Sequence, residues 1–592
     1  MAGRSSFRWL CCVCLGVVRA SAALDAPPST DVDVVVVGAG YAGLAAAHQL
    51  LNAQLRVAVL EAADHVGGRT RNFDLASGEF DTASDAVVEV GGTFVAPGHT
   101  ALIALAQETG HELYNVSGSA AGGQGGQAWR WRRPRLGAPP GEWPWWYWGV
   151  DTDSALAASV FLSASGRHLF TKPADVEAAF AAETWAELEA AGHALAQEAA
   201  AIECDRDTPV DDPDSSAWFA ADAITFEGWL RAHLAQPEAR SVLRNMCRGM
   251  IAQEPAQVSF LSTLKSLKGC WSAGAEDQYR IRGGTQAVPL TLAERVAAAP
   301  GGSVSLSAPV RAVEVAGSGR RTVLTVRLAN GTSLTARFAV LTGPPALVGA
   351  ISISPPAALG HLQAQLLQRM PMGTSMKYFV AYDTPWWREA KLSGAVMASS
   401  WARQGRRAAA AVIGPGAELQ QLQGGGSPSW GDHFDQCMEH SPFDGTTGSG
   451  GGTRHYALMC WVEGESNQHF YSALGSAAEQ RAHVLGFLEA AFNDTRASRL
   501  AKHVVAHNWA DQPYARGAYT GFFSPGVQSQ PELWQTFAAL QSAPGGGWAP
   551  HVWVAGSEYQ VGFGNGYIEG AIRGGYAAAT AVAAAHASSR GD

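Results

Sequence analysis

The sequence lacks a surplus of basic residues. Its 42 lysines and arginines are outnumbered by 52 aspartates and glutamates, which gives a formal net charge of −10. Proteins that bind nucleic acids neutralise phosphates with surplus cations, so no nucleic-acid partner is expected. Beyond residue 23 the sequence also lacks a C-x-x-C pair or a Cys/His cluster with the spacing of metal ligands. We therefore expect no metal site.

No apolar run near the N-terminus is long enough to span a bilayer comfortably. Residues 1–23 instead combine a charged start with a short apolar stretch and small residues, at Arg4, Arg8, Trp9–Val18 and Ala20–Ala22. This order predicts a secretory signal peptide and therefore a secreted protein or a secretory-pathway location. Three N-x-S/T triplets, at Asn115, Asn330 and Asn493, predict a glycoprotein.

Cysteine is scarce. Three of the eight cysteines lie in the predicted signal, which leaves Cys204, Cys247, Cys270, Cys437 and Cys460. Because five is an odd number, at least one thiol stays free or pairs with another molecule. The sequence does not fix which cysteines pair.

The clearest pattern that is present lies in residues 31–61. A β-branched run precedes Gly38, Gly40 and Gly43, a helical segment follows, and a second apolar strand ends at Glu61. In this arrangement the glycines permit a tight turn, a close approach of the backbone to a pyrophosphate, and close packing of the helix on the strand. An acid at the position of Glu61 accepts hydrogen bonds from an adenosine ribose. The segment therefore predicts dinucleotide binding.

A second glycine-rich segment follows directly. Gly67 and Gly68 precede Arg69, whose planar guanidinium suits a phosphate. Its place after the Glu61 strand would bring Arg69 to the same pyrophosphate.

These two motifs, V-V-G-A-G-Y-A-G-L and E-A-x-x-x-V-G-G-R-T, resemble those of the flavin-dependent amine oxidases, which include monoamine and polyamine oxidases. The resemblance continues in Val90–Phe94, in the G-x-x-x-K segment ending at Lys377, and in residues 507–526, 552–558 and 566–571. It implies FAD as cofactor and oxidation of a C–N bond with O2 as electron acceptor.

The resemblance also implies a fold and a domain arrangement. The fold is α/β, a Rossmann-like FAD-binding domain with an inserted α+β substrate-binding domain. The FAD-binding domain would comprise residues 31–112, 280–346 and 505–587, and the substrate-binding domain residues 113–279 and 347–504. The cofactor-binding residues it implies are Gly38, Gly40, Ala42, Gly43, Glu61, Gly68, Arg69, Gly92, Thr93, Val310, Trp509, Glu558 and Ile568.

Three residues are candidates for a catalytic role. Lys377 stands among apolar neighbours in a strand-like segment, and a buried lysine is costly without a partner. The resemblance implies that this lysine reaches the flavin N5 through a water and aids the reaction with O2. Tyr519 and Tyr567 match the two tyrosines that flank the substrate amine in monoamine oxidases. Two facing π-systems would guide and polarise an amine nitrogen.

Two departures from the family pattern lead to further expectations. Ala518 occupies the place where some monoamine oxidases have the cysteine that bonds to FAD, so non-covalent FAD is expected. The chain ends in an Ala-rich, polar segment rather than an apolar tail, so no membrane anchor is expected.

Several local predictions can be compared with the structure. Helices are expected in residues 175–202 and, as one unit, in Phe226–Leu243. Two alternating strands, 321–328 and 333–341, flank an Asn330-Gly331 hairpin turn. Residues 424–452, rich in Gly and Ser, are expected to form a long surface loop. The aromatic segment 143–148 is expected to pack in a core.

The most specific function expected is the oxidation of an amine by FAD and O2 to an aldehyde, with release of hydrogen peroxide and ammonia or a smaller amine. One alternative is an L-amino-acid oxidase of the same fold, although residues 93–97 offer no arginine for a carboxylate. Another is a polyamine oxidase, for which Glu276 and Asp277 could supply an acidic pocket. The alternative from another class is a secreted flavin-binding protein without turnover. The oligomeric state is not fixed by the sequence.

Overall fold

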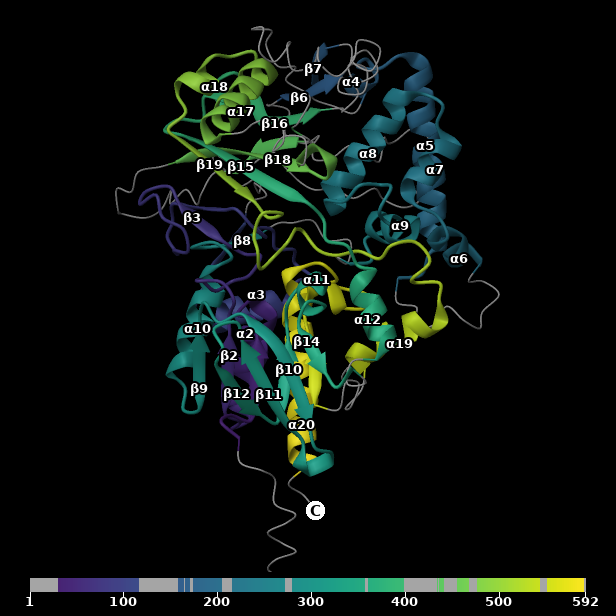
Figure 1. Ribbon diagram of the computed structural model, residues 1–592. Coiled ribbons are helices and arrows are strands. Elements are labelled where there is room, and N and C mark those ends of the chain that lie inside the picture. The colour runs from purple at the N-terminus through teal and green to yellow at the C-terminus, as the bar shows by residue number, and fades with distance from the viewer. Residues whose placement is uncertain are drawn as a thin grey trace, which may run out of the picture.

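The computed structural model describes residues 30–115, 158–163, 166–170, 174–204, 216–271, 279–356, 360–398, 434, 436–440, 455–467, 476–542 and 551–589. The predicted signal peptide, the aromatic segment 143–148, and Glu276 and Asp277 lie outside these residues. The chain folds into two lobes, one above the other in Figure 1. The predicted α/β class is confirmed.

The lower lobe is built on a five-stranded parallel sheet. Its strand order is β20 (Val552–Val554), β13 (Phe338–Leu341), β1 (Val34–Val37), β2 (Val57–Leu60), β9 (Gly302–Ser305). The central strands are continuous apolar runs because both of their faces are covered.

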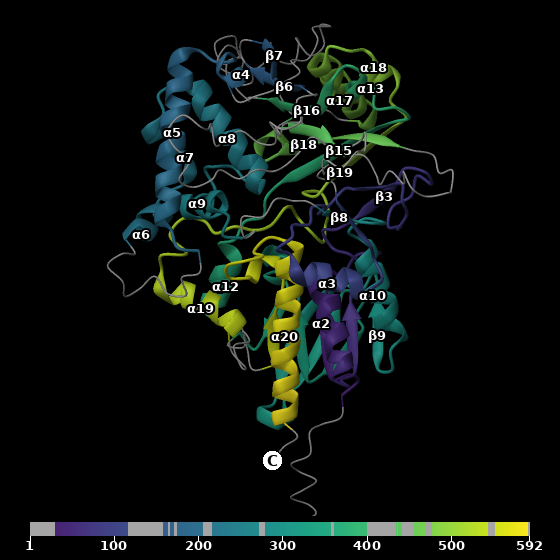
Figure 2. The ribbon, with the colours of Figure 1, turned by 180° about the vertical axis from the view of Figure 1, so that it is seen from behind.

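The two faces of this sheet are covered by different elements. Val34 and Val36 point to helices α2 (Tyr41–Asn52), α10 (Ala287–Ala298) and α20 (Ile568–Ser588). Helices α2 and α20 lie side by side in Figure 2. Val35 points the other way, to the sheet of β12 (Ser333–Ala336), β11 (Val323–Leu328), β10 (Val310–Ala316) and β14 (Ser352–Ser354).

The upper lobe contains a seven-stranded sheet. Its order is β19 (His503–Asn508), β15 (Ser375–Tyr382), β18 (Tyr456–Glu463), β17 (Gln436–Glu439), β16 (Leu392–Ala398), β6 (Ala158–Ser163), β7 (Gly166–Phe170). The predicted domain boundary at residue 505 falls inside β19, an edge strand of this sheet. Helix α17 (Ala477–Phe492) packs its apolar side chains in one cluster with those of the inner strands β15, β18 and β16.

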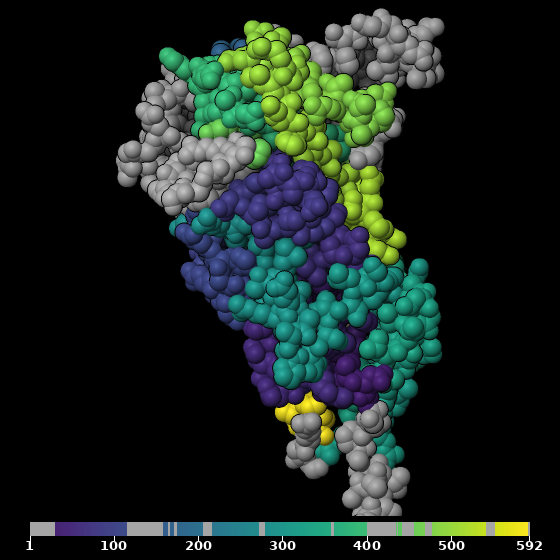
Figure 3. All heavy atoms as spheres, turned by 90° about the vertical axis from the view of Figure 1, so that its left-hand side faces the viewer, coloured from purple at the N-terminus to yellow at the C-terminus, as the bar shows by residue number. Residues whose placement is uncertain are grey.

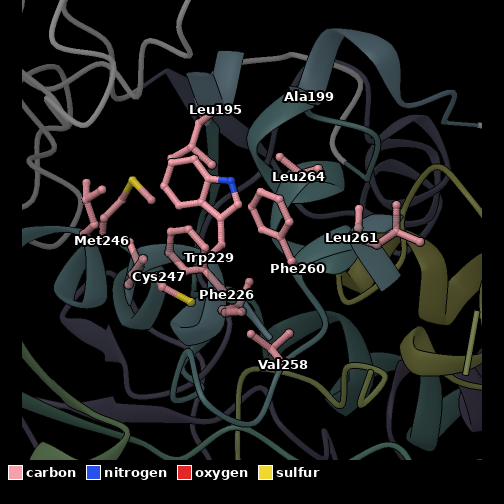
Figure 4. Close-up of a cluster of buried hydrophobic side chains, with 14 of the residues drawn as sticks. Leu195, Ala199, Phe226, Trp229, Met246, Cys247, Val258, Phe260, Leu261 and Leu264 are labelled. Carbon is pink, nitrogen blue, oxygen red and sulfur yellow. The ribbon is translucent and has the colours of Figure 1, made fainter. Parts of the chain in front are cut away.

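Beside this sheet, a helical layer is held by aromatic packing. Its members are α5 (Ala182–Ala201), α6 (Ser216–Asp222), α7 (Phe226–His233), α8 (Pro237–Ile251) and α9 (Phe260–Lys268). The rings of Phe226 and Trp229 stack on Phe260, with centroids 5.8 and 5.4 Å away (Figure 4). Between the lobes lie β3 (Asn72–Asp74) and β4 (Val87–Glu89), and in Figure 3 the purple atoms of this part of the chain lie between the green and the teal ones.

Three local predictions were wrong. The expected helix Phe226–Leu243 is two helices, because the residue before a proline avoids the α-helical region and Pro237 starts a new helix. The expected strand 333–341 is divided at Arg337, since β12 completes a hairpin whereas β13 enters the parallel sheet. The expected surface loop 424–452 contains β17, a four-residue strand too short to show a period.

The cysteine pairing that the sequence left open is now visible. Disulfides join Cys204 to Cys270 and Cys437 to Cys460, and Cys247 is a free, buried thiol. Cys437 and Cys460 face each other on the neighbouring strands β17 and β18. Within the described residues, no helix is both long and apolar enough to cross a bilayer.

Candidate active site

A single cavity of about 1130 Å³ connects the two lobes. Val37 and Leu60, at the carboxyl ends of β1 and β2, line one end, and Lys377 and Trp461 of the seven-stranded sheet line the other. Ligands of open α/β sheets bind at such carboxyl ends. All predicted site residues except Gly43 and Glu558 line this cavity.

The glycine turn after β1 forms one wall. Gly38 has a φ of +107°, and a Cβ there would lie 2.5 Å from Thr342 Oγ1. Gly40 precedes α2, whose first residues line the cavity, including Ala42. Gly43 does not face the cavity: a Cβ there would lie 1.9 Å from the Gly38 carbonyl oxygen. Gly43 thus serves the close packing of α2 on the turn.

Glu61 fixes the turn from the end of β2. Its two oxygens accept hydrogen bonds from the amides of Ala39 at 2.6 Å and Ala63 at 2.8 Å. Burial raises the pKa of this carboxyl, although the amides oppose that rise. The Ala308 amide donates to the Glu61 carbonyl at 2.7 Å, so Val310, which also lines the cavity, lies near Glu61, where the sequence predicts the adenosine ribose.

Arg69 and Glu558 form a buried pair. Arg69 Nη2 donates to Glu558 Oε2 at 2.9 Å, Nη1 donates to the other carboxylate oxygen, and Nη1 also donates to the Tyr519 carbonyl at 2.9 Å. Burial favours the neutral acid, but the Arg69 charge outweighs it and holds the pKa of Glu558 below its usual value. Glu558 itself does not line the cavity, because its carboxylate is engaged by Arg69 and by the Ser557 hydroxyl, so it would act on a ligand through Arg69.

Lys377 lies on β15 with only 5% of its surface exposed. Its Nζ donates to the Gly91 carbonyl at 2.5 Å and to Thr93 Oγ1 at 3.2 Å. Burial lowers the pKa of Lys377 to about 8, against the opposing charge of Glu89. Strand β15 thus delivers the lysine to the cavity with the partners that a buried ammonium requires.

Behind Lys377 lies a buried acid that the sequence analysis did not single out. Glu89 accepts a hydrogen bond from the Thr285 amide at 2.9 Å and lies 3.4 Å from His440 Nε2. Burial raises the pKa of Glu89 to about 7, and the positive charge of Arg280 opposes this rise.

Tyr519 and Tyr567 both line the cavity and come from different packing clusters. Tyr519 packs beside the strands of the upper lobe, and its hydroxyl donates to Glu463. Tyr567 packs against the helical layer, with its ring 5.2 Å from that of His99. The adjacent backbones meet, since a Cβ at Gly566 would lie 2.9 Å from Thr520 Cγ2. Both tyrosines therefore reach the same part of the cavity.

The remaining predicted residues complete the wall. Gly92 lies against Ile568, because a Cβ on Gly92 would be 3.5 Å from Ile568 Cδ1. Trp509 Nε1 donates to the Val90 carbonyl at 2.8 Å, which fixes the indole beneath the segment that contains Thr93. Gly68 faces Gly40, with a Cβ at Gly68 3.4 Å from the Gly40 Cα.

Sequence reasoning missed the far end of the cavity. Met250 of α8, Leu267 of α9, Trp271 and Phe522 line it, and the rings of Trp271 and Phe522 stack with centroids 4.9 Å apart. Met250, Leu267 and Trp271 lie outside the segments that resemble the family, and Phe522 lies within one but was not singled out, so no local pattern identified them. The only signal was proximity in sequence to Cys270.

The residues present fit FAD. A helix N-terminus and a glycine turn face the phosphate region, and Glu61 faces the ribose region. Three buried polar atoms lie on cavity-lining residues without a hydrogen-bond partner in the described part of the chain: Ser375 Oγ, His507 Nε2 and Thr520 Oγ1. Buried polar groups normally have partners, so these atoms suit a polar ligand.

The sequence is similar to those of known proteins. The family model for flavin-containing amine oxidoreductases matches residues 41–583. An L-amino acid dehydrogenase of Synechocystis sp. is 27% identical over 94% of this chain and 95% of its own length. A putrescine oxidase of Kocuria rosea is 32% identical over 63% of this chain and 68% of its own.

Solved structures agree in fold. A putrescine oxidase variant superposes with a TM-score of 0.66 at 24% identity, covering 94% of this chain and 99% of its own. Cyclohexylamine oxidase from Brevibacterium oxydans gives a TM-score of 0.66 at 23% identity, covering 93% and 99%. With the family match spanning nearly the whole chain, the protein belongs to the flavin-containing amine oxidoreductase family.

Proposed function

We propose that this FAD-dependent enzyme oxidises a small primary or secondary amine to an aldehyde. Amine, O2 and water would give the aldehyde, hydrogen peroxide, and ammonia or a smaller amine. The observation that carries the proposal is the continuous cavity, which joins a dinucleotide cradle to Lys377, Tyr519 and Tyr567.

The chain's own residues have two tasks in this reaction, beside the chemistry that FAD supplies. Bound FAD would supply the redox chemistry, which is to take up a hydride from the substrate and to pass its electrons on to O2. Tyr519 and Tyr567 would hold the neutral amine between their rings and orient its α-C–H bond. Lys377, held by Gly91 and Thr93, places a positive charge where negative charge develops on oxygen.

Non-covalent FAD is part of the proposal. Ala518, next to Tyr519, has no thiol that could bond to the flavin. Precipitating the purified enzyme with acid should therefore leave all of the yellow colour in the supernatant. Colour that stays with the precipitated chain would contradict this prediction.

The substrate alternatives differ in the charge that they require. The relatives' names include an amino acid and a diamine as substrates of those proteins. An amino acid needs a cation for its carboxylate, and residues 93–97 contain none. Beside the polar Ser266 and Gln436, which lie near Met250, the far end of the cavity presents the apolar side chains of Met250, Leu267, Trp271 and Phe522. They support an apolar monoamine as the preferred substrate.

Secretion is also proposed. The signal-like N-terminus is supported by two disulfides, which persist in oxidising compartments. Two of the predicted glycosylation acceptors, Asn330 and Asn493, lie at exposed positions. Expression in a secreting host should deliver glycosylated enzyme to the medium, and a form retained in the cytosol would contradict the proposal.

A substrate panel tests the proposed reaction. Purified enzyme is offered apolar monoamines, diamines, polyamines and L-amino acids, and hydrogen peroxide is measured. We expect the highest kcat/KM with an apolar monoamine. If only amino acids or only polyamines yield peroxide, that class replaces the apolar monoamines as the substrate. If no compound yields peroxide although FAD is bound, the result supports a binding protein without turnover.

A further inference from the structure

Glu463 is a fully buried carboxylate that no part of the reaction described above uses. It is the last residue of β18 and lies opposite Ser375 of β15, while Trp461 lies opposite Lys377. Because side chains alternate along a strand, all four point to the same face of the sheet. Ser375, Lys377 and Trp461 line the cavity on that face.

Tyr519 covers Glu463 from the cavity side. The Tyr519 hydroxyl donates a hydrogen bond to Glu463 Oε1. A phenol that donates to a carboxylate forms a charge-assisted bond, and its ring gains electron density as the O–H bond is polarised. The amine therefore meets the ring of Tyr519, with the hydroxyl already engaged from behind.

The turn after Glu463 fixes the backbone at the end of β18. The Gly464 amide donates to the Thr374 carbonyl at 2.9 Å, and Thr374 Oγ1 donates to the Gly464 carbonyl at 3.2 Å. Gly464 has a φ of +57°, and a Cβ there would lie 2.4 Å from Glu254 Oε1. Arg248 in turn holds Glu254 through Nε at 2.8 Å. The backbone next to Glu463 is thus fixed by two hydrogen bonds and by close packing against the Arg248–Glu254 ion pair.

We propose that Glu463 is a positioning residue that acts through Tyr519: it fixes the phenol ring and makes its π-face more negative toward the substrate nitrogen. The inference rests on the proposed amine oxidation. As the α-C–H bond breaks, its hydrogen and both electrons pass to FAD, the nitrogen lone pair forms a C=N bond, and positive charge develops on nitrogen. A negative group behind the adjacent ring stabilises that charge more in the transition state than in the neutral ground state.

A double-mutant cycle tests whether the two residues act together. Glu463→Gln keeps the shape and an acceptor oxygen but removes the charge, and Tyr519→Phe removes the hydroxyl. With the holoenzyme, we expect Glu463→Gln to lower kcat about tenfold when Tyr519 is present and to have little further effect in Tyr519→Phe. Equal fold-losses in both backgrounds would overturn the proposal.

A binding measurement separates this role from a structural one. An amine without an α-hydrogen binds but cannot be oxidised, so its Kd can be measured by calorimetry on each holoenzyme. We expect its Kd to change by less than about threefold in Glu463→Gln, because charge develops only in the transition state. A loss of binding as large as the loss of kcat would overturn the proposal.

Two further variants keep the test decisive. Glu463→Asp retains the charge, so its kcat should lie between those of Glu463→Gln and the wild type. If Glu463→Gln does not fold, Glu463→Asp takes its place in the double-mutant cycle. Glu439→Gln changes another buried glutamate of the same sheet, which pairs with Arg388 away from the cavity. It should lower the thermal midpoint and leave kcat unchanged.

If the wild type yields no peroxide with any amine, the proposed function itself fails. If the wild type turns over and the effects in the double-mutant cycle are additive, only the role of Glu463 fails.

Discussion

At the scale of single residues, the site depends on charged side chains that are buried together with their partners. Lys377 has carbonyl and hydroxyl acceptors, and Arg69 has the carboxylate of Glu558. Burial of such groups is costly unless hydrogen bonds and opposite charges offset it. Removing one partner should therefore have specific and separable effects.

Lys377→Met should slow the reaction with O2. Because burial lowers the pKa of Lys377 to about 8, the ammonium is present below that pH and is lost as the pH rises through it. In the wild type, the rate of reoxidation by O2 should fall over that range. In the variant it should be roughly 100-fold lower and independent of pH there.

Stopped-flow kinetics checks this prediction by separating anaerobic reduction by the amine from reoxidation by O2. Reduction should change little. Lys265→Met is a matched control, because Lys265 is also buried but lies 3.9 Å from the Trp218 ring, away from the cavity. Slower reoxidation in that control, or an unchanged pH profile in Lys377→Met, would be inconsistent with the assigned role.

Glu558→Gln should destabilise the protein and weaken FAD binding. The variant leaves the Arg69 guanidinium partly buried without its counter-charge, at a cost of about 3–5 kcal/mol. Since the pKa of Glu558 is depressed in the fold, its stabilisation is complete above the ordinary carboxyl pKa and disappears as the pH falls through the folded value.

Urea unfolding at several pH values measures this effect. The difference between wild type and variant should shrink as the pH is lowered. Glu314→Gln, which breaks an exposed pair with Arg327, serves as a control and should barely shift the unfolding midpoint. Equal shifts in both variants would refute a special role for the Arg69–Glu558 pair.

At the scale of elements, the sequence predicted best where a motif fixes the backbone. The β1–α2–β2 unit was predicted because three glycines and a terminal acid specify one geometry. Residues 333–341 were misjudged, because an alternating pattern does not reveal that a chain leaves one sheet for another at Arg337. Glu463 and the far end of the cavity were not predicted, since their roles arise from contacts between strands and loops distant in sequence.

Gly43→Ala should separate α2 from the glycine turn. The new Cβ would lie 1.9 Å from the Gly38 carbonyl oxygen, a backbone atom that cannot rotate away. We expect a loss of roughly 3 kcal/mol and an enzyme purified without FAD. Gly228→Ala in α7 is the control, because its nearest atom is a threonine hydroxyl at 3.4 Å. Visible absorbance and thermal unfolding report the outcome, and a yellow, stable Gly43→Ala protein would contradict the packing argument.

At the scale of the whole molecule, the cavity is assembled from segments that are far apart in the chain. The turn at Gly38, Val310 and Ile568 belong to the lower lobe, whereas Lys377 and Trp461 belong to the upper one (Figure 1). A ligand that fills the cavity therefore contacts both lobes. It binds the native state and finds no equivalent site in the unfolded chain.

FAD should accordingly stabilise both lobes together. A ligand at a hundredfold its Kd adds about 2.7 kcal/mol to the free energy of unfolding. Calorimetry of the apoenzyme should show the unfolding midpoint rising steadily with FAD concentration. ADP resembles only the adenosine diphosphate half of FAD and reaches Glu61 and the glycine turn but not Lys377. At the same concentration it should therefore raise the unfolding midpoint less than FAD does. At the same multiple of its own Kd, each ligand adds the same free energy through binding alone, so an equal rise of the midpoint would confirm only the binding equilibrium. The bridging argument therefore requires FAD to merge two overlapping unfolding transitions into one. Two transitions that stay separate at saturating FAD would show that the lobes do not share the ligand.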